Sequence, residues 1–416
     1  MEGMAYFVSN LLIFSVPSSV GTSFSVILLS KQFFQLQSYA KTAGMDYLCA
    51  EKLTEMSKKV LVGMSGGVDS TAACLLLQEQ GWEVVGLTMR VFDIPSQCVS
   101  GEPRCVVEAR EVAARLGIEH HVVDVREEFR SRIVGAFCDE YMHGRTPNPC
   151  VLCNPLFKFR LLVEWADRLG CSHIATGHYV RVKDGYLCEG RDKYKDQSYF
   201  LWRVAPEVLQ RSLFPLGEMT KDEVRAYLAD RDFALKASEG ESMEICFIEH
   251  DYREFLRSEV PDLDQRFGSG RFVDNAGRTL GLHKGCPYYT VGQRKGLGIA
   301  LGQPAFVLRI NAERNTVVLG SEEDLKTTDM LVETPAADLP LQQWKTTPSP
   351  LAVRIRYRSR PVPCEVKGEV QPGLTLVHLL EPVSGIAPGQ SAVFYDGERL
   401  LGGAFIASQK GLGQYI

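Results

Sequence analysis

The chain of 416 residues lacks long apolar runs, an excess of positive charge and the dense cysteine spacing of a disulfide-rich secreted domain. Two apolar stretches near the start, residues 5–16 and 23–29, fall short of the roughly 20 residues that a membrane-spanning helix needs. No Lys or Arg precedes the first stretch, so the basic start of a signal peptide is also missing. A net charge of −5 requires that any nucleic-acid site be a local basic patch.

The composition is that of a water-soluble globular protein, with 45% hydrophobic and 23% charged residues and neither a repeat nor a low-complexity tract. The length predicts two or three domains of roughly 150 residues each. Twelve cysteines are scattered over the chain, which favours a reducing cytoplasmic setting where they serve as thiols, ligands or catalysts.

The first 55 residues are Ser-rich and apolar and differ from the rest. Met56, followed by Ser-Lys-Lys directly before the first expected strand, resembles a native start. We therefore predict that residues 1–55 are an upstream extension or dispensable leader outside the fold. N-terminal sequencing of the natural protein tests this, and a mature end well upstream of Met56 contradicts it.

The stretch Val60–Ser70 joins a short apolar strand to a helix through a glycine-rich turn. Backbone N–H groups at a helix N-terminus have no partner within the helix and bind anions. Small residues let phosphate oxygens come close, and the hydroxyls of Ser65, Ser70 and Thr71 can add hydrogen bonds. The turn is therefore a candidate phosphate site.

This turn lacks the Gly-Lys-Ser/Thr ending of the Walker loop and the third glycine of the dinucleotide fingerprint. Residues Ser65–Ser70 instead match the pyrophosphate loop of the ATP pyrophosphatases, which cleave ATP between its α and β phosphates. An ordinary tight turn is the alternative, but six matching residues between a strand and a helix favour the nucleotide site. We expect Mg²⁺ to neutralise the triphosphate, because no Walker lysine is present, with Asp69 as a candidate ligand.

Strands alternate with helices up to about residue 257, which predicts a doubly wound parallel α/β sheet with ligands at the carboxyl ends of its strands. Gly63–Ser70, Met89 and Gly177 fall at such ends. A hairpin is expected over residues 179–189. The expected strands are 60–62, 83–89, 120–124 and 171–176, and the expected helices are 68–79, 103–116, 126–142, 155–169 and 220–231.

After this region, short alternating runs predict two small β-rich domains, the last of them a β-barrel. We expect an ATP-pyrophosphatase domain at 56–257, a central β domain at 258–335 and the barrel at 336–416. Residues 335–350 are proline-rich and are expected to be a linker. The expected strands are 271–273, 305–310, 316–319, 351–358, 363–370, 374–380, 391–395 and 399–406.

Four arginines alternate along the strand expected at 351–358 and just beyond it: Arg354, Arg356, Arg358 and Arg360. Alternate residues of a strand share one face, so these side chains predict a stripe of phosphate contacts on the barrel. An ordinary solvated strand face is an equally good interpretation of this feature alone.

Cys150 and Cys153 lie three positions apart in a proline-flanked loop expected between two helices, and Cys246 is a third candidate thiol. Zinc is disfavoured because no second Cys-x-x-Cys or His pair follows. A redox dithiol usually opens a helix, which this loop does not. A sulfur-handling or Fe–S site fits an enzyme that activates an oxygen with ATP and replaces it, because thiolates and their persulfides are strong nucleophiles.

Seven motifs together make residues 56–416 resemble the tRNA-specific 2-thiouridylases. They are Gly63–Ser70, Thr146–Pro149, Thr176–Tyr179, Lys195–Tyr199, Ile245–Ile248, Val291–Leu297 and Ala387–Tyr395. The resemblance implies an enzyme that uses ATP to adenylate the C2 oxygen of the wobble uridine of tRNA and releases pyrophosphate. It also implies sulfur transfer from a cysteine persulfide, loaded by a sulfur-donor relay protein, with no membrane involved.

The resemblance also implies roles for individual residues. ATP would be bound by Gly63, Met64, Ser65, Gly66, Gly67, Val68, Asp69, Ser70, Met89 and Gly177. The nucleophile would be Cys153 and the persulfide carrier Cys246. The target base would be faced by Asn148, Pro149 and Cys150. The tRNA would be contacted by His178, Lys195, Asp196, Gln197, Arg356, Tyr357 and Gln390.

One departure concerns Cys150, where many members of that family have Asp. A carboxylate can act as an acid or base there, and a thiol is a poorer substitute at neutral pH. Together with Cys153 and Cys246 it makes a three-thiol set suited to a [4Fe–4S] cluster with one open iron; free thiols are the alternative.

Two other functions stay open at this point: an ATP-pyrophosphatase ligase or amidotransferase acting on a small metabolite, and an ATP-regulated RNA-binding protein. The small-metabolite enzymes need neither a thiol pair nor RNA-binding barrels. Pyrophosphate release that depends on tRNA separates all three.

Overall fold

The computed structural model describes residues 6–8, 11–18, 21–28, 58–238, 240, 245–334 and 350–414. The chain forms two compact units, Met1–Ser57 and Lys58–Ile416. In the first unit, β1 (Tyr6–Val8), β2 (Leu11–Ser18) and β3 (Gly21–Leu28) pair in an antiparallel sheet. The leader hypothesis for residues 1–55 stays a prediction, and the predicted linker falls almost entirely outside the described residues.

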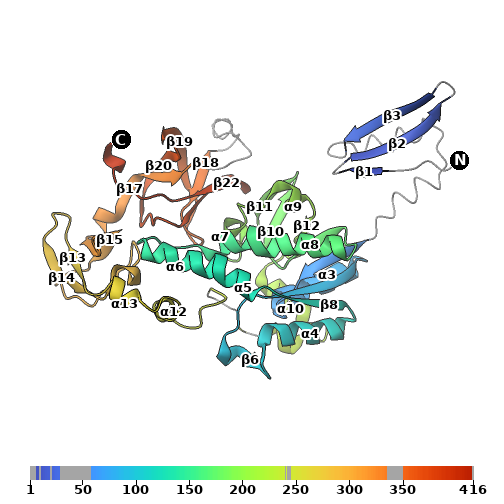
Figure 1. The fold of residues 1–416 in the computed structure, drawn as a ribbon, viewed down its shortest axis with the longest axis horizontal. Coiled ribbons are helices and arrows are strands. Elements are labelled where there is room, and N and C mark those ends of the chain that lie inside the picture. Colours follow the sequence, from blue (N-terminus) through green and yellow to red (C-terminus); the bar gives the residue numbers. More distant parts are fainter. Residues whose placement is uncertain are drawn as a thin grey trace. The chain divides into compact units, whose positions relative to one another are not determined.

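A five-stranded sheet of the order β12-β9-β4-β5-β8 forms the centre of the first part of the second unit (Figure 1). All its pairings are parallel, which confirms the predicted α/β class. The strands are β4 (Lys59–Gly63), β5 (Glu83–Arg90), β8 (Glu119–Asp124), β9 (His173–Ala175) and β12 (Ser212–Leu213).

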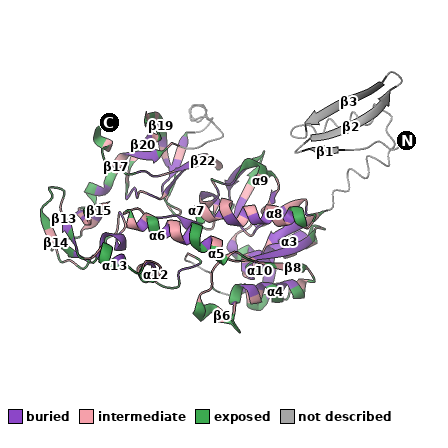
Figure 2. Cartoon of the chain, viewed as in Figure 1, coloured by how far each residue is buried: buried purple, intermediate pink, exposed green. Residues whose placement is uncertain are grey.

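Helices cover both faces of this sheet because successive residues of a strand point to opposite sides. Val60 and Val62 of β4 pack with residues of α3 (Val68–Glu79) and α4 (Arg104–Leu116), whereas Leu61 packs with residues of α8 (Arg160–Arg168). All three β4 side chains are fully buried, and Figure 2 shows this strand layer as the buried centre of the domain. The continuous apolar run of β4 follows from burial on both faces.

The predicted helix over 126–142 is continuous but passes through a π-helical turn, Arg130–Val134, between α5 (Arg126–Phe129) and α6 (Gly135–Met142). Helix α10 (Lys221–Ala229) begins at a capping box formed by Thr220 and Glu223. The remaining helices in this part of the chain are α7 (Pro149–Cys153), α9 (Pro206–Gln210), α11 (Ala234–Ala237), α12 (Tyr252–Glu259) and α13 (Leu263–Arg266).

The C-terminal half is rich in β structure, as predicted. Four strands form the central sheet in the order β14-β13-β16-β15, with bounds Thr279–His283, Gly270–Val273, Thr316–Gly320 and Phe306–Asn311. A larger sheet includes β17 (Lys326–Glu333), β18 (Leu351–Arg354), β19 (Val362–Gln371), β20 (Leu374–Ser384), β21 (Ser391–Asp396) and β22 (Arg399–Phe405).

Two elements cross the domain boundaries expected from sequence. Strand β17, which the predicted boundary at residue 335 assigns to the central domain, pairs with β20 of the larger sheet. The hairpin of β10 (Val180–Lys183) and β11 (Tyr186–Glu189) joins the same sheet through β22. Proline content indicates where a chain turns, but it does not reveal which sheet a strand joins.

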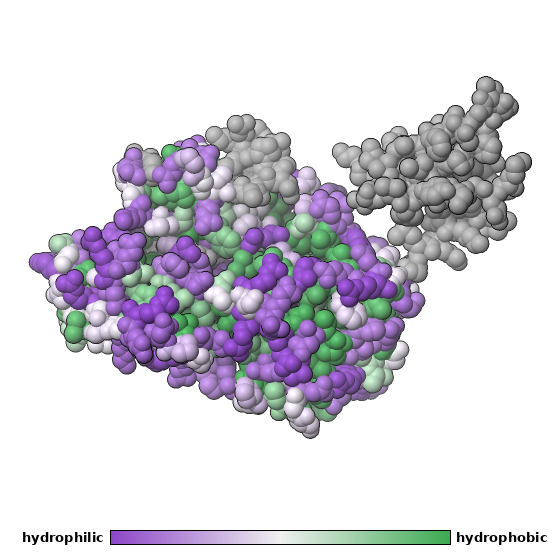
Figure 3. All heavy atoms as spheres, viewed as in Figure 1, coloured by the Kyte–Doolittle hydropathy of each residue, from purple (hydrophilic) through white to green (hydrophobic). Residues whose placement is uncertain are grey.

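The surface visible in Figure 3 is mostly hydrophilic, with apolar residues in smaller groups. Within the part of the chain that the structure describes, none of the helices combines the length and apolar character that crossing a membrane requires.

Candidate active site

The glycine-rich turn after β4 is held by its own short-range hydrogen bonds. The hydroxyls of Ser70 and Thr71 donate to the carbonyl oxygen of Gly67 over 3.2 and 2.9 Å, and the Ser65 N–H donates to the Ser70 hydroxyl over 3.3 Å. Gly66 has φ +74°, and a Cβ placed on it would lie 2.5 Å from the Ala109 nitrogen. Helix geometry leaves the first N–H groups of α3 as donors for an anion.

Asp69 lies at the second position of α3 and binds two donors through one carboxylate oxygen. The Lys221 ammonium and the Tyr179 hydroxyl each lie 2.7 Å from Asp69 Oδ1. Gly177 packs against the same residue, since a Cβ there would lie 2.9 Å from the Asp69 carbonyl carbon. Sequence reasoning missed Lys221, which opens α10 and brings a buried positive charge to a loop without a Walker lysine.

The predicted ATP-binding positions gather at one edge of the parallel sheet. Gly63 ends β4, Met89 is the penultimate residue of β5, and Gly177 follows β9. The Met64 N–H donates to Leu87 O over 2.8 Å, which ties the loop to the neighbouring strand. This placement at the carboxyl ends is where open α/β sheets bind ligands.

The segment that carries Cys150 and Cys153 is helical, so the prediction of a loop there was wrong. Pro149–Cys153 is helix α7, with Pro149 in the first turn, and a π-helical turn, Asn154–Phe159, continues it into α8. Proline is favoured in the first turn of a helix, where its missing N–H has no partner to lose. The sequence argument against a redox dithiol relied on that loop and is therefore withdrawn.

The three thiols influence one another electrostatically. Solvent reaches Cys246, yet the surrounding protein raises its pKa to about 12, by burial first and then by the charges of Cys153 and Cys150. Burial likewise raises the pKa of Cys153 to about 11. Within the described ranges, however, no three His, Cys, Asp or Glu side chains approach as a metal-binding group. The [4Fe–4S] cluster stays a prediction, because the cysteine ligands of such a cluster lie further apart than the ligands of a single metal ion.

Lys158, in the π-helical turn after α7, is the cation shared by these thiols. Its charge favours the thiolate and lowers the pKa of Cys150, Cys153 and Cys246, although burial dominates each shift. Burial first, and then the charge of Lys158, hold the pKa of His178 well below its usual range. Lys158 lies five residues beyond Cys153, but nothing in the sequence indicates that it also reaches Cys246.

The C-terminal barrel holds the chain that leads into α7. Gln390 Nε2 donates to the carbonyl oxygens of Thr146 and Pro147 over 3.1 and 2.9 Å, and the Thr146 N–H donates to Pro388 O over 2.7 Å. A Cβ added at Gly389 would lie 2.8 Å from Thr146 O. The thiol-bearing helix is thus positioned by residues more than 240 positions later in the chain.

Several residues expected to contact tRNA are internal in this structure. Asp196 is 2% exposed and accepts hydrogen bonds from Arg354 and Ser198, each over 2.9 Å. His178 is buried against Phe159 and Thr176, whose hydroxyl lies 2.7 Å from His178 Nδ1. The Gln197 side chain accepts from the Tyr179 N–H. Lys195, Arg356 and Tyr357 are at least partly exposed. Of the three target-base candidates, Cys150 is exposed, whereas Asn148 and Pro149 are buried.

The predicted arginine stripe was wrong because β18 ends at Arg354. Arg354 points inward and forms buried ion pairs with Glu189 and Asp196. Arg356 donates to the carbonyls of Val291 and Gly385, and Arg360 pairs at the surface with Glu381. Alternation in the sequence could not reveal the distant carboxylates that draw Arg354 into the core.

The parallel α/β sheet and the glycine-rich turn after β4 define an ATP-pyrophosphatase-type domain, which is followed by two β-rich domains. Family models match all three parts: a tRNA methyl transferase HUP domain at 58–250, a tRNA methyl transferase PRC-barrel domain at 253–321 and an aminomethyltransferase beta-barrel domain at 333–406. The chain belongs to the tRNA-specific 2-thiouridylase family, as the sequence motifs indicated.

Two relatives illustrate how far the similarity extends. The chain is 60% identical over 371 residues to tRNA-specific 2-thiouridylase MnmA 3 of Phocaeicola vulgatus, covering 86% of this chain and 97% of the relative. It is 47% identical over 362 residues to tRNA-specific 2-thiouridylase MnmA of Syntrophotalea carbinolica, covering 85% and 100%.

A solved structure, the U34-tRNA thiolase NcsA from Methanococcus maripaludis with its [4Fe-4S] cluster, matches 50% of this chain and 65% of its own. The TM-score is 0.29 and the identity 18%. A likeness this weak says nothing about a cluster in this chain.

Proposed function

We propose that the protein is an ATP-dependent tRNA-uridine 2-sulfurtransferase that acts on the wobble uridine. The observation that carries this proposal is the 60% identity to a 2-thiouridylase over nearly that relative's whole length. The pyrophosphate loop and the thiol-bearing helix on the same domain give the two halves of the reaction, oxygen activation and sulfur delivery. A reducing cytoplasm suits the free thiols that the reaction needs.

The first half-reaction activates the C2 oxygen of uridine. This oxygen attacks the α-phosphorus of ATP, pyrophosphate leaves, and an O-adenylated base forms. The N–H groups at the start of α3 and the nearby Lys221 ammonium offer positive potential to the phosphates. Mg²⁺ would add charge neutralisation, and the Asp69 carboxylate retains one oxygen beside Lys221 for it.

The second half-reaction replaces that oxygen with sulfur. The terminal sulfur of a Cys246 persulfide attacks C2, and AMP leaves with the original oxygen. The Cys153 thiolate then attacks the Cys246 sulfur, so a Cys153–Cys246 disulfide forms and the electron pair stays on the sulfur bonded to C2. A thiol reductant must reopen the disulfide, and a sulfur-donor protein must reload Cys246 before the next turnover.

Proton loss from the Cys153 thiol is a costly part of this sequence, because burial raises its pKa to about 11. Loading sulfur onto Cys246 meets the same obstacle, since the pKa of its free thiol is raised as well. The positive charge of Lys158 favours the thiolate of each. Cys150, in place of a carboxylate, has no charge to offer at neutral pH, since a thiol is protonated there and desolvation by the surrounding protein raises its pKa further, although solvent reaches the side chain. We therefore assign Lys158 the task of stabilising the sulfur anions. No step is assigned to an Fe–S cluster.

Reconstitution with ATP, Mg²⁺, a tRNA transcript and a sulfur-donor protein loaded with a persulfide tests the proposal, with a thiol reductant added to reopen the Cys153–Cys246 disulfide. We expect 2-thiouridine in the nucleoside mass spectrum and pyrophosphate release that requires tRNA. Pyrophosphate release that a small-molecule acceptor supports without tRNA would instead identify a metabolite ligase. A transcript with cytidine at the wobble position is the matched negative substrate.

A further inference from the structure

Two polar side chains meet on the face of the parallel sheet that α4 covers, next to the pyrophosphate loop. Thr88 of β5 is 2% exposed, and His120 of β8 is half-buried. The strand register pairs His120 with Gly86, so Thr88 and His120 point to the same side of the sheet. Thr88 Oγ1 and His120 Nε2 lie 2.8 Å apart.

Thr88 also reaches the chain that leads into the loop. Its hydroxyl donates to the carbonyl oxygen of Met64 over 3.0 Å, and both groups are buried. The Met64 N–H donates to Leu87 O, so β5 holds both backbone groups of Met64. The Met64 side chain occupies the space beside Gly86, where an added Cβ would clash with Met64 Sδ.

These contacts determine which atom carries each proton. A carbonyl oxygen only accepts, so the single hydroxyl proton of Thr88 goes to Met64 O. The Thr88 oxygen must then accept its second bond, which His120 donates from Nε2. Burial first, and then the charges of Arg110 and His121, lower the pKa of His120, so the ring carries one proton at neutral pH. The donors therefore run from His120 to Thr88 to Met64.

The peptide bond between Met64 and Ser65 is held at both ends. A trans peptide is planar and directs its C=O and N–H to opposite sides. Thr88 binds the carbonyl oxygen, and the Ser70 hydroxyl oxygen accepts from the Ser65 N–H over 3.3 Å. This peptide sets the path of the chain into Gly66, which has φ +74° and opens the turn where phosphate is expected.

We propose that Thr88 and His120 are positioning residues of the nucleotide site. His120 orients the Thr88 hydroxyl, and that hydroxyl holds the first peptide of the pyrophosphate loop in the direction that phosphate binding needs. Thr88 is buried and acts through Met64. The proposal rests on the proposed function, whose ATP site it concerns, and adds two residues from outside the nucleotide motif.

Loss of the hydroxyl would leave the buried Met64 carbonyl without its donor. The peptide could then rotate toward another partner, and ATP would bind only the molecules that keep the original direction. The apparent dissociation constant rises as that fraction falls. An unpaired buried carbonyl corresponds to about a tenfold change in such an equilibrium.

Calorimetric titration of the full chain with ATP and Mg²⁺, in the absence of tRNA, tests the proposal. Thr88→Val removes the hydroxyl at nearly constant volume, whereas Thr88→Ser keeps it. His120→Leu removes the donor, whereas His120→Gln keeps an amide N–H near the position of Nε2. Thermal unfolding of each variant separates a loss of affinity from a loss of stability.

Ser172 offers a matched control at the other end of β4. Its hydroxyl donates to Lys59 O over 3.2 Å and lies 3.0 Å from His173 Nδ1, so a hydroxyl again joins a histidine to a backbone carbonyl. Lys59 begins β4, at the end of the strand away from the loop. Ser172→Ala should therefore lower stability and leave ATP affinity unchanged.

We expect Thr88→Val to weaken ATP binding about tenfold, and His120→Leu about threefold because Thr88 keeps its bond to Met64 there. Thr88→Ser and His120→Gln should stay within about twofold of the wild type, since each keeps its donor. In pyrophosphate release with tRNA, Thr88→Val should raise KM for ATP and keep kcat, because saturating ATP selects the correct loop direction.

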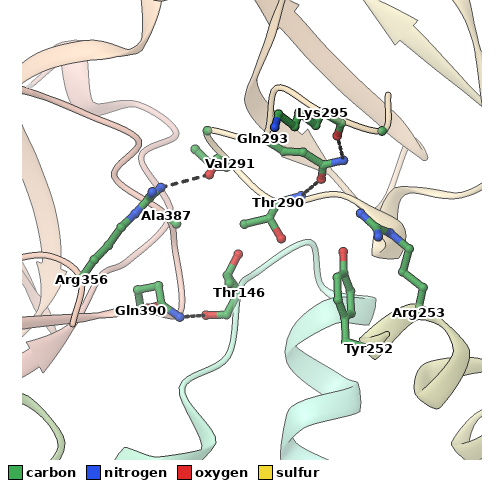
Figure 4. Close-up of a pocket in the computed structure, with 12 residues that line it drawn as sticks. Thr146, Tyr252, Arg253, Thr290, Val291, Gln293, Lys295, Arg356, Ala387 and Gln390 are labelled. Carbon is green, nitrogen blue, oxygen red and sulfur yellow. Dashed lines mark hydrogen bonds between the residues drawn. The ribbon is translucent and has the colours of Figure 1, made fainter. Parts of the chain in front are cut away.

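Binding of tRNA should not change in these variants. The cavity shown in Figure 4 is lined by Arg356 and Gln390, two of the predicted tRNA contacts, and Gln390 donates there to Thr146 O. Among the described residues, neither Thr88, His120 nor any member of the pyrophosphate loop lines this cavity. A defect confined to ATP is therefore the signature of the proposed role.

The proposal fails if Thr88→Val binds ATP like the wild type, or if Ser172→Ala reproduces its loss of affinity. Nitrogen NMR of a histidine-labelled sample adds a readout without ATP: the signal that disappears in His120→Gln should report a proton on Nε2, and a proton on Nδ1 would contradict the proposal. Absence of thiolation by a wild type that binds ATP counts against the proposed function alone.

Discussion

The nucleotide loop and the thiol-bearing helix sit on one domain but depend on very different contacts. The loop is held by hydrogen bonds among Ser65, Gly67, Ser70 and Thr71, at most five residues apart. The segment before α7 is held by Gln390, 244 residues from Thr146. We therefore expect ATP binding to depend on the α/β domain alone, and sulfur delivery to require the barrel as well.

This difference has a functional consequence. If the barrel also binds tRNA, then the same domain both receives the substrate and fixes the position of the thiols. We expect the loop, by contrast, to bind ATP whether or not tRNA is present. The four predictions below separate the two regions, from the largest expected effect to the smallest.

Removal of either central thiol should abolish thiolation. Cys153→Ala and Cys246→Ala each delete a sulfur that forms or breaks a bond in the proposed sequence, so we expect no detectable 2-thiouridine by nucleoside mass analysis. The affinity for ATP should stay at the wild-type value, because neither thiol belongs to the loop. Cys105→Ala, at an exposed cysteine outside the site, is the control. Retained thiolation in Cys246→Ala would rule out its role as carrier.

A substitution in the nucleotide loop should have the opposite effect and weaken ATP binding. Gly66→Ala places a Cβ 2.5 Å from the Ala109 nitrogen at φ +74°. Because the backbone must move where phosphates bind, we expect ATP affinity to fall by roughly ten- to 100-fold, the effect of losing a hydrogen bond to a charged group. Titration of ATP by calorimetry measures it, and RNA binding should persist.

Gly81→Ala is the matched control for the effect of placing alanine at a positive φ angle. Gly81 has φ +79°, and a Cβ there meets nothing within 4 Å. It should lose about 1 kcal/mol of stability through its backbone conformation and keep its ATP affinity. Equal ATP affinities in the two variants would show that the tight contact at Gly66 does not shape the site.

Loss of the long-range contact should affect only the sulfur step. Gln390→Ala removes the donor to the carbonyls of Thr146 and Pro147, so α7 should lose its fixed position. We expect kcat for thiolation to fall by roughly ten- to 100-fold at saturating tRNA, with ATP affinity unchanged. Gln390→Glu, which has the same size but no donor, should behave alike. A raised KM for tRNA with normal kcat would instead identify Gln390 as a direct RNA contact.

The same contrast explains what the sequence could and could not predict. Helix α3 was predicted with its observed bounds, Val68–Glu79, because its signals are local: a glycine turn, an apolar stripe and a glycine stop. The contact between Lys221 and Asp69 joins residues 152 positions apart, and Arg354 meets a carboxylate 158 positions away. Such pairings depend on tertiary packing and produce no periodic pattern in the sequence.

Helix α7 was missed for a different reason. The flanking prolines are compatible both with an extended loop and with the first turn of a helix. Packing decides between the two: Val151 is fully buried, and Phe157 beyond it packs against Phe129, which in turn packs against Phe247. Phe247 follows Cys246 directly, so the same aromatic core anchors both thiol-bearing segments, and only the folded chain reveals that connection.

The smallest effect concerns Lys158, whose charge favours the thiolate of all three cysteines. The pKa of Cys153 is about 11, so its thiolate fraction and its alkylation by iodoacetamide should rise about tenfold per pH unit from 7 to 9. Lys158→Ala should raise that pKa further and lower the rate several-fold at each pH in this range, because the thiolate loses a nearby positive charge. Lys158→Arg, which keeps the charge, should retain most of the rate. Peptide mass analysis at Cys153 measures it; identical pH profiles for wild type and Lys158→Ala would mean that the thiols are activated only when substrate arrives.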